Sequence, residues 1–138
     1  MLNNKKNIQL LINTFKKFNN KTLINHISTK KKITYASFLD RSFEFLNFLK
    51  LKKKLKEGDR VIIKIENSPE YLISIFACFL GGFIACPIDM KTPNVRYAKI
   101  KKMLKFKYEI NKINKVKYLK ANKYPNISSK NLIGMIIF

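Results

Sequence analysis

The sequence predicts an α/β fold in which a partial parallel sheet is flanked by helices. Residues 61–65 form a nearly continuous β-branched run, which is typical of a strand buried on both faces. A helical pattern follows at 69–80, and a short apolar strand pattern follows that at 83–87. A strand, a crossover helix and a second strand of these lengths predict a right-handed parallel unit.

The helix of this unit has recognisable start and stop signals. Ser68 fits the N-cap, Pro69 is tolerated at the first helical position, and Glu70 complements the positive end of the helix dipole. Gly81 and Gly82 end the helix, because glycine accepts the left-handed conformation common just past a helix. These signals fix the order strand, helix, glycine turn, strand.

Three elements are predicted before this unit. Residues 1–20 indicate an amphipathic packing helix, with apolar side chains at Ile8, Leu11, Ile12, Phe15 and Phe18. Residues 22–28 indicate a short strand, followed by a lysine turn at 30–32. Thr34 fits the N-cap of a helix through Leu49, whose apolar residues are too many for one stripe, so more than one side should be covered.

The remaining third of the chain is less regular. Thr92-Pro93 opens a predicted helix through Leu104. Residues 105–124 mix lysine with aromatic and aliphatic residues without clear periodicity, which fits a short strand at a sheet edge plus a basic loop better than a nucleic-acid platform. Residues 132–138 (LIGMIIF) have the pattern of a further buried strand.

The charge balance is strongly basic. There are 29 basic and 8 acidic residues, giving +21 and a pI near 10.1. Such a surplus attracts nucleic acid or anionic lipid non-specifically. Only Arg41, Arg60 and Arg96 are arginine, the residue preferred for bidentate phosphate and base contacts, and the lysine-, Asn- and Ile-rich composition matches A/T-rich codons. We therefore expect no specific nucleic-acid binding, and a basic module contacting RNA or an acidic surface is the alternative hypothesis.

Chemistry-bearing residues are sparse. Cys78 and Cys86 have no CxxC spacing and no ligand cluster, which indicates free buried thiols in a reducing compartment. His26 has no neighbour in the sequence that suggests a catalytic pair. The sequence therefore singles out no catalytic, cofactor-binding or metal-binding residue.

One segment resembles a membrane span in length. Residues 71–88 are free of charge, at the lower limit of 18 for crossing a bilayer. Gly81-Gly82 and Pro87 argue against a membrane helix, because a helix that ends in a glycine turn and is followed by a short strand explains all three residues. We expect no transmembrane span, no signal peptide and a cytoplasmic location, with a membrane-associated protein as a further hypothesis.

Five segments carry a resemblance to a known family. They are ITYASF at 33–38, GDRV at 58–61, NSPE at 67–70, LGGFIACPID at 80–89, and Pro93 with Arg96. In order and spacing they resemble the superfamily of adenylate-forming ligases, which includes acyl-CoA synthetases, luciferases and peptide-synthetase adenylation domains. Leu80-Gly81 and Cys86 depart from the usual residues, but only as packing changes. The resemblance covers about residues 22–104 and implies the first part of the large N-terminal domain of such an enzyme.

The resemblance also implies what this sequence lacks. In the family, ATP and Mg support formation of an acyl-adenylate, and the acyl group then passes to CoA or a carrier protein. The family's phosphate loop, its adenine and ribose segments and its late lysine have no match here, and residues 131–138 resemble the strand that leads into the phosphate loop. The expected organisation is an amino-terminal helix at 1–21 and a truncated AMP-binding subdomain at 22–138.

Several origins and partners are compatible with this truncated pattern. The fragment is expected to be inactive alone, as a frameshifted or split gene product or half of a two-chain enzyme. Its partner would be the remainder of the ligase domain. Whether the chain is itself an enzyme stays open, because the family is enzymatic and the motifs are absent.

Overall fold

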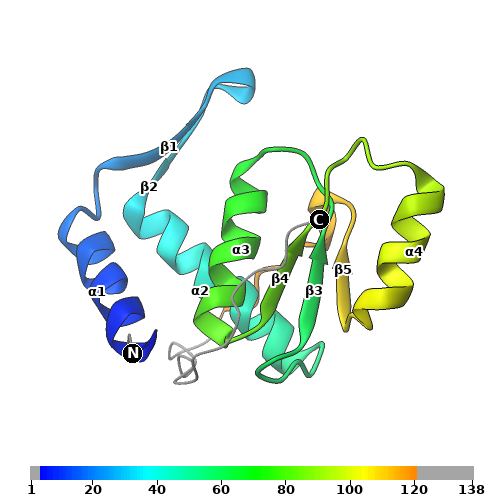
Figure 1. Ribbon diagram of the computed structural model, residues 1–138. Helices are drawn as coiled ribbons and strands as arrows, with labels where there is room; N and C mark the ends of the chain where they lie inside the picture. Colours follow the sequence, from blue (N-terminus) through cyan, green and yellow to red (C-terminus); the bar gives the residue numbers. More distant parts are fainter. Residues whose placement is uncertain (1–3, 121–138) are drawn as a thin grey trace.

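The computed structural model describes residues 4–120 and shows a small sheet with helices on both faces (Figure 1). The helices predicted at 1–20, 34–49 and 69–80 and the strand predicted at 83–87 form close to their expected positions. The helices are α1 (Asn4–Lys17), α2 (Tyr35–Leu51), α3 (Pro69–Gly81) and α4 (Asn94–Leu104), and the strands are β1 (Thr22–His26), β2 (Lys31–Thr34), β3 (Arg60–Ile63), β4 (Ile84–Pro87) and β5 (Tyr108–Ile110).

The main sheet has the order β4-β3-β5, and both strand pairs are parallel. Val61 in the central strand lies opposite Ala85 on one side and Tyr108 on the other. Helices α2 and α3 lie on one side of this sheet and α4 lies on the other (Figure 1). The predicted α/β class and parallel unit are confirmed, while the strand predicted at 132–138 lies outside the described residues.

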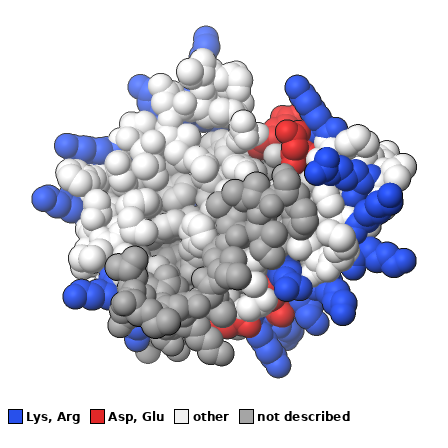
Figure 2. Space-filling view, in the orientation of Figure 1, with Lys and Arg blue, Asp and Glu red and all other residues white. Residues whose placement is uncertain are grey.

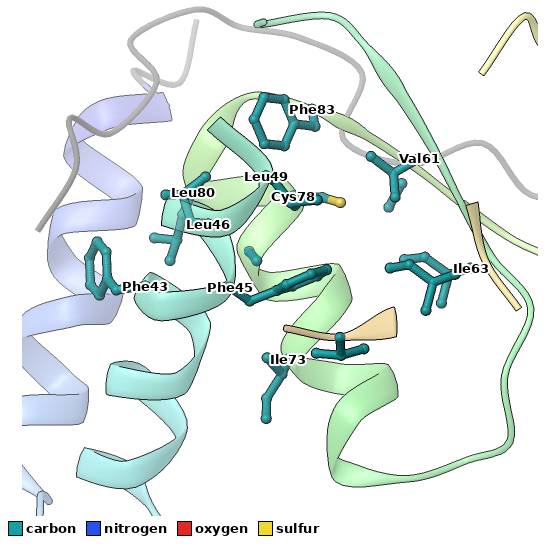
Figure 3. Close-up of a cluster of buried hydrophobic side chains, with 14 of the residues drawn as sticks. Phe43, Phe45, Leu46, Leu49, Val61, Ile63, Ile73, Cys78, Leu80 and Phe83 are labelled. Atoms are coloured by element: carbon teal, nitrogen blue, oxygen red, sulfur yellow. The ribbon is translucent and has the colours of Figure 1, made fainter. Parts of the chain in front are cut away.

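The face toward α2 and α3 contains the larger core (Figure 3). Val61, Ile63 and Ala85 point to this face, where they meet buried side chains from both helices, among them Phe45, Leu46, Leu49, Ile73, Cys78 and Leu80. Helix α2 is buried along most of its length, as its broad apolar pattern predicted. This core joins the predicted strand–helix–strand unit to the preceding helix.

The face toward α4 has a separate, smaller core. It consists of Ile62, Cys86, Ile88, Ile100 and Leu104. Neighbouring residues of a strand point to opposite faces, so Ile62 and Ile63 belong to different cores. The same alternation places Cys86 of β4 on the α4 face, whereas Cys78 of α3 lies in the larger core. Both thiols are free and buried, as predicted.

The amino-terminal part differs in detail from prediction. Helix α1 packs through Ile8 and Ile12, and Phe15 stacks on Phe76 of α3 with ring centroids 5.3 Å apart. Leu11 is 48% exposed, so its assignment to the packing stripe was wrong. The lysines at 30–32 were predicted to form a turn, but the turn is at 27–30, and Lys31 and Lys32 lie in β2, paired antiparallel with β1.

Beyond β5 the chain crosses back over α2. Val116 is buried in the larger core, and the backbone N–H of Leu119 donates to the carbonyl of Glu44 at 3.0 Å. Arg41 donates to the Tyr118 hydroxyl at 2.8 Å and forms an ion pair with Glu70 of α3 at 3.3 Å. These contacts hold α2, α3 and residues 116–119 together.

Within residues 4–120, no helix combines the length and the apolar character needed to cross a bilayer. The uncharged stretch at 71–88 is divided between α3 and β4.

Candidate functional site

A crevice opens at the carboxyl edge of the sheet, between the ends of β3 and β4. The chain leaves β3 for α3 on one face and leaves β4 for α4 on the other, so the two connecting loops diverge. In open α/β sheets, this point of divergence is where ligands bind. The cavity found there measures about 680 Å³, and residues 65–67 and 87–91 line it together with Tyr71 and Ile75.

Backbone and lysine contacts fix the two loops. The amide of Ile88 donates to the Ile63 carbonyl at 2.9 Å, which extends the β3–β4 pairing by one residue. The Lys64 ammonium donates to the Met90 carbonyl at 3.3 Å and lies 4.8 Å from the centre of the Tyr97 ring. Asp89 accepts the backbone N–H of Lys91 at 2.6 Å. The crevice is therefore a formed feature of the fold.

The lining combines an apolar floor with a polar rim. Ile65, Ile75 and Ile88 contribute apolar surface, whereas Glu66, Asn67, Asp89 and Lys91 are polar. These groups can hold a polar ligand or a polypeptide by hydrogen bonds and ion pairs. The described lining has no serine or cysteine next to a histidine, which a triad-type nucleophile would need. Within residues 4–120 there is also no cluster of three or more side chains suited to a metal.

The two cysteines and the histidine do not line the crevice. Burial raises the pKa of both the Cys78 and Cys86 thiols, so neither is a ready nucleophile. His26 lies in the β1–β2 hairpin, where its ring nitrogens contact the hydroxyls of Thr29 at 2.7 Å and Ser28 at 3.1 Å. These are local turn contacts at exposed residues.

A second polar cluster joins α4 to β5. Tyr97 donates to the Glu109 carboxylate, and the Lys101 ammonium lies 3.1 Å from the same carboxylate. Burial opposes ionisation of Glu109, but these two partners outweigh it and hold the pKa of this carboxyl below its ordinary value of 4.5. Burial and the hydrogen bond to Glu109 raise the pKa of Tyr97. The cluster is an internal link, because every group in it has a protein partner.

The GDRV segment serves the fold. Gly58 has φ +88°, and its amide donates to the Gly82 carbonyl at 2.8 Å, which ties the start of β3 to the end of α3. Asp59 accepts the Lys56 amide at 2.7 Å and closes the preceding turn. Arg60 donates to the Leu104 carbonyl at 2.9 Å, so its positive charge neutralises the negative end of α4.

The NSPE and LGG segments also serve the fold. The Ser68 hydroxyl accepts the Tyr71 amide at 3.2 Å as the N-cap of α3, and Pro69 is its first residue. Gly81 packs against the core so closely that an added Cβ would lie 2.6 Å from Leu46 Cδ1. Gly82 ends the helix with φ 71°. In these two segments Ser68, Pro69, Gly81 and Gly82 thus have structural roles, while Asn67 lines the crevice.

The sequence identified the strands that form the crevice but not the crevice itself. Asn67 and Asp89 each follow a predicted parallel strand, so a site at the shared carboxyl edge was open to inference. The sequence did not show that the helices after these two strands, α3 and α4, pack on opposite faces of the sheet, and the crevice depends on that arrangement.

One family model matches most of the chain. The profile of the family described as AMP-binding enzyme matches residues 12–132. Homeostatic regulator of DAG from Saccharomyces cerevisiae is 31% identical over 118 residues, which are 83% of this chain and 7% of that protein. The match therefore covers a small part of a much longer relative.

Solved structures show the same fold. The N-terminal subdomain of Klebsiella oxytoca NpsA has a TM-score of 0.68 at 23% identity, over 91% of this chain and 32% of that one. Apo MatB from Rhodopseudomonas palustris gives 0.65 at 24% identity, over 78% and 21%. The N-terminal domain of FACL13 from Mycobacterium tuberculosis gives 0.67 at 19% identity, over 79% and 26%. This chain spans less than a third of each.

Proposed function

The chain belongs to the AMP-binding enzyme family, and we propose that it forms the amino-terminal segment of an adenylate-forming domain whose catalytic residues lie outside these 138 residues. Its role is then to supply the first parallel strands and their helices as a scaffold. The observation that carries the proposal is that the recognisable family motifs are used in turns, caps and close packing.

We propose that ATP and Mg are bound by the complete domain, outside the described residues. The crevice rim carries two carboxylates, Glu66 and Asp89, beside the single lysine Lys91, and Lys64 is engaged with Met90, so the lining offers little positive charge for phosphate groups. No metal-ligand cluster is found within residues 4–120. We therefore derive no adenylation step from this chain. The acid activation, and the transfer of the acyl group to CoA or a carrier protein, belong to the complete domain.

An exposed apolar surface supports the need for more protein. A groove of about 300 Å³ runs between α1, the hairpin and α3, lined by Phe15, Leu23, Ile24, Phe38, Leu72, Ile75, Phe76 and Phe79. Leu72 is 46% exposed and Phe79 is 36% exposed, although α3, the helix that carries both, packs its other face into the larger core. Apolar patches of this kind mark contact sites. The proposed occupant is the remainder of the adenylate-forming domain.

The proposal keeps the division into a helix at 1–21 and a truncated subdomain at 22–138. It places the protein in the cytoplasm, because buried free thiols such as Cys78 and Cys86 persist in reducing compartments.

The test is acid-dependent ATP–pyrophosphate exchange by the purified 138-residue chain, with ATP binding measured by calorimetry. We expect neither exchange nor binding from a chain whose circular dichroism shows it to be folded. Adding the polypeptide encoded downstream of codon 138, in whichever frame carries a Thr/Ser/Gly-rich segment with a lysine, should restore exchange. Robust exchange by the chain alone refutes the proposal.

A further inference from the structure

Basic residues are frequent in the part of the chain that contains α4. Residues 91–120 contain eleven basic residues and a single acidic one, Glu109. Glu109 is already engaged with Tyr97 and Lys101, so it does not offset the surface charge around it. Figure 2 shows many Lys and Arg side chains on the side of the molecule that α4 occupies in Figure 1, and others along the opposite edge.

The outward face of α4 combines this charge with exposed apolar side chains. Val95 is 72% exposed and Met103 is 66% exposed, and they lie two helical turns apart. Between them on the same face lie Lys99 and Lys102, both exposed, while Ile100 and Leu104 hold the opposite face in the core. Single exposed apolar residues are ordinary on a protein surface. Here two of them flank two lysines on one helix face, which gives that face a mixed apolar and basic surface.

The loop before α4 continues the same surface. Met90 is 44% exposed and precedes Lys91, which is also exposed. A helix face with exposed apolar side chains between lysines suits the surface of an anionic bilayer. The apolar side chains can enter the headgroup layer, and the ammonium groups can bind the lipid phosphates. We propose that α4 and the preceding loop, with Met90, Val95, Lys99, Lys102 and Met103, bind the surface of anionic lipid membranes.

Nucleic acid fits this surface less well. Base stacking needs exposed aromatic rings, but the rings nearest α4, Tyr97 and Phe106, are half-buried and covered by the Lys101 ammonium at 5.2 and 5.5 Å from their centres. Arg96 is the one arginine among residues 91–120, so bidentate phosphate contacts are scarce. Val95 and Met103 would add nothing to phosphate binding.

The experiment is co-sedimentation of the full chain with vesicles of phosphatidylcholine alone or with about one-third phosphatidylglycerol. We expect binding to the anionic vesicles only. The variant Lys99→Glu/Lys102→Glu should bind at least about tenfold more weakly, because each lysine near an anionic surface contributes roughly fivefold. The matched control is Lys5→Glu/Lys16→Glu, which makes the same charge change at exposed positions of α1. Its vesicle binding should weaken by less than about threefold, because these lysines lie outside the proposed membrane surface.

A second variant separates a membrane site from a simple polycation. Val95→Ser/Met103→Ser keeps every charge and should weaken vesicle binding severalfold while leaving binding to single-stranded RNA unchanged. Circular dichroism of each variant checks that the fold is kept, which is expected since all substituted residues are exposed. The proposal is overturned if the α1 control loses as much binding as the α4 variant, if the serine variant binds vesicles like the parent, or if the parent does not bind anionic vesicles.

Discussion

Among residues 4–120, the sheet face toward α2 and α3 contains most of the core, whereas the cluster on the α4 face has five buried residues. Two helices and the 116–119 segment cover the first face, and within residues 4–120 one helix covers the second. The charges of the covering helices also differ, because α4 has four basic residues and no acidic one, whereas α2 carries Asp40 and Glu44 as well as Arg41 and Lys50. The larger core therefore specifies the fold, and the α4 side is free to present a binding surface.

Adjacent residues of β3 allow the strongest test of this difference. Ile62 and Ile63 are both fully buried, but they enter the small and the large core respectively. We expect Ile63→Ala to lower the free energy of unfolding by about 3–5 kcal/mol and Ile62→Ala by about 2–3 kcal/mol, because a small cluster under one helix can collapse around the cavity. Urea unfolding of the two variants measures both values. Equal or reversed losses would contradict the proposed division of the core.

Gly81 tests how tightly α3 is packed on the large-core side. An added Cβ would lie 2.6 Å from Leu46 Cδ1 and 2.7 Å from Phe83 Cε2, and both neighbours are buried. We expect Gly81→Ala to cost about 1–2 kcal/mol net, because overpacking exceeds the helix propensity gained by alanine. Thermal or urea unfolding measures this cost.

The variant Gly58→Ala is the control, since no atom lies within 4 Å of its added Cβ and only its φ of +88° opposes alanine. A double-mutant cycle with Leu46→Ala should show coupling for Gly81→Ala and none for Gly58→Ala. Additive losses at Gly81 and Leu46 would show that the close approach is relieved without cost.

The smallest expected effect concerns the polar link on the α4 side. The pKa of Glu109 is lowered in the folded state, so its carboxylate contributes stability that is present above its ordinary value of 4.5 and is lost as the pH falls through the folded value. Glu109→Gln should reduce stability at pH 7 by less than about 1 kcal/mol, as for a single ion pair near the surface. The difference from the parent should shrink between about pH 5 and pH 3.

Denaturant midpoints across this pH range check the prediction. Tyr97→Phe removes one of the two partners and should show a weaker form of the same pH dependence. A Glu109→Gln difference that stays constant with pH would mean that the carboxylate contributes through packing and not through its charge.

Local signals predicted the α3 unit well. Ser68 and Pro69 start the helix and the glycines end it, because caps and left-handed turns depend on residues within a few positions of each other. The Thr34 cap of α2 is confirmed in the same way, with its hydroxyl accepting the Ser37 amide at 3.1 Å. The candidate crevice was not predicted, because it depends on two helices that pack on opposite faces.

By itself the sequence determined the order of the helices and strands, the parallel unit and the family, since capping, β-branched runs and glycine turns act over short distances. Only the tertiary structure decided that Lys31 and Lys32 extend a hairpin, that Leu11 faces outward, and that Ile62 and Ile63 serve different cores. Each of those outcomes depends on partners distant in the chain, whose backbone pairing and packing outweigh the preferences of the residues themselves.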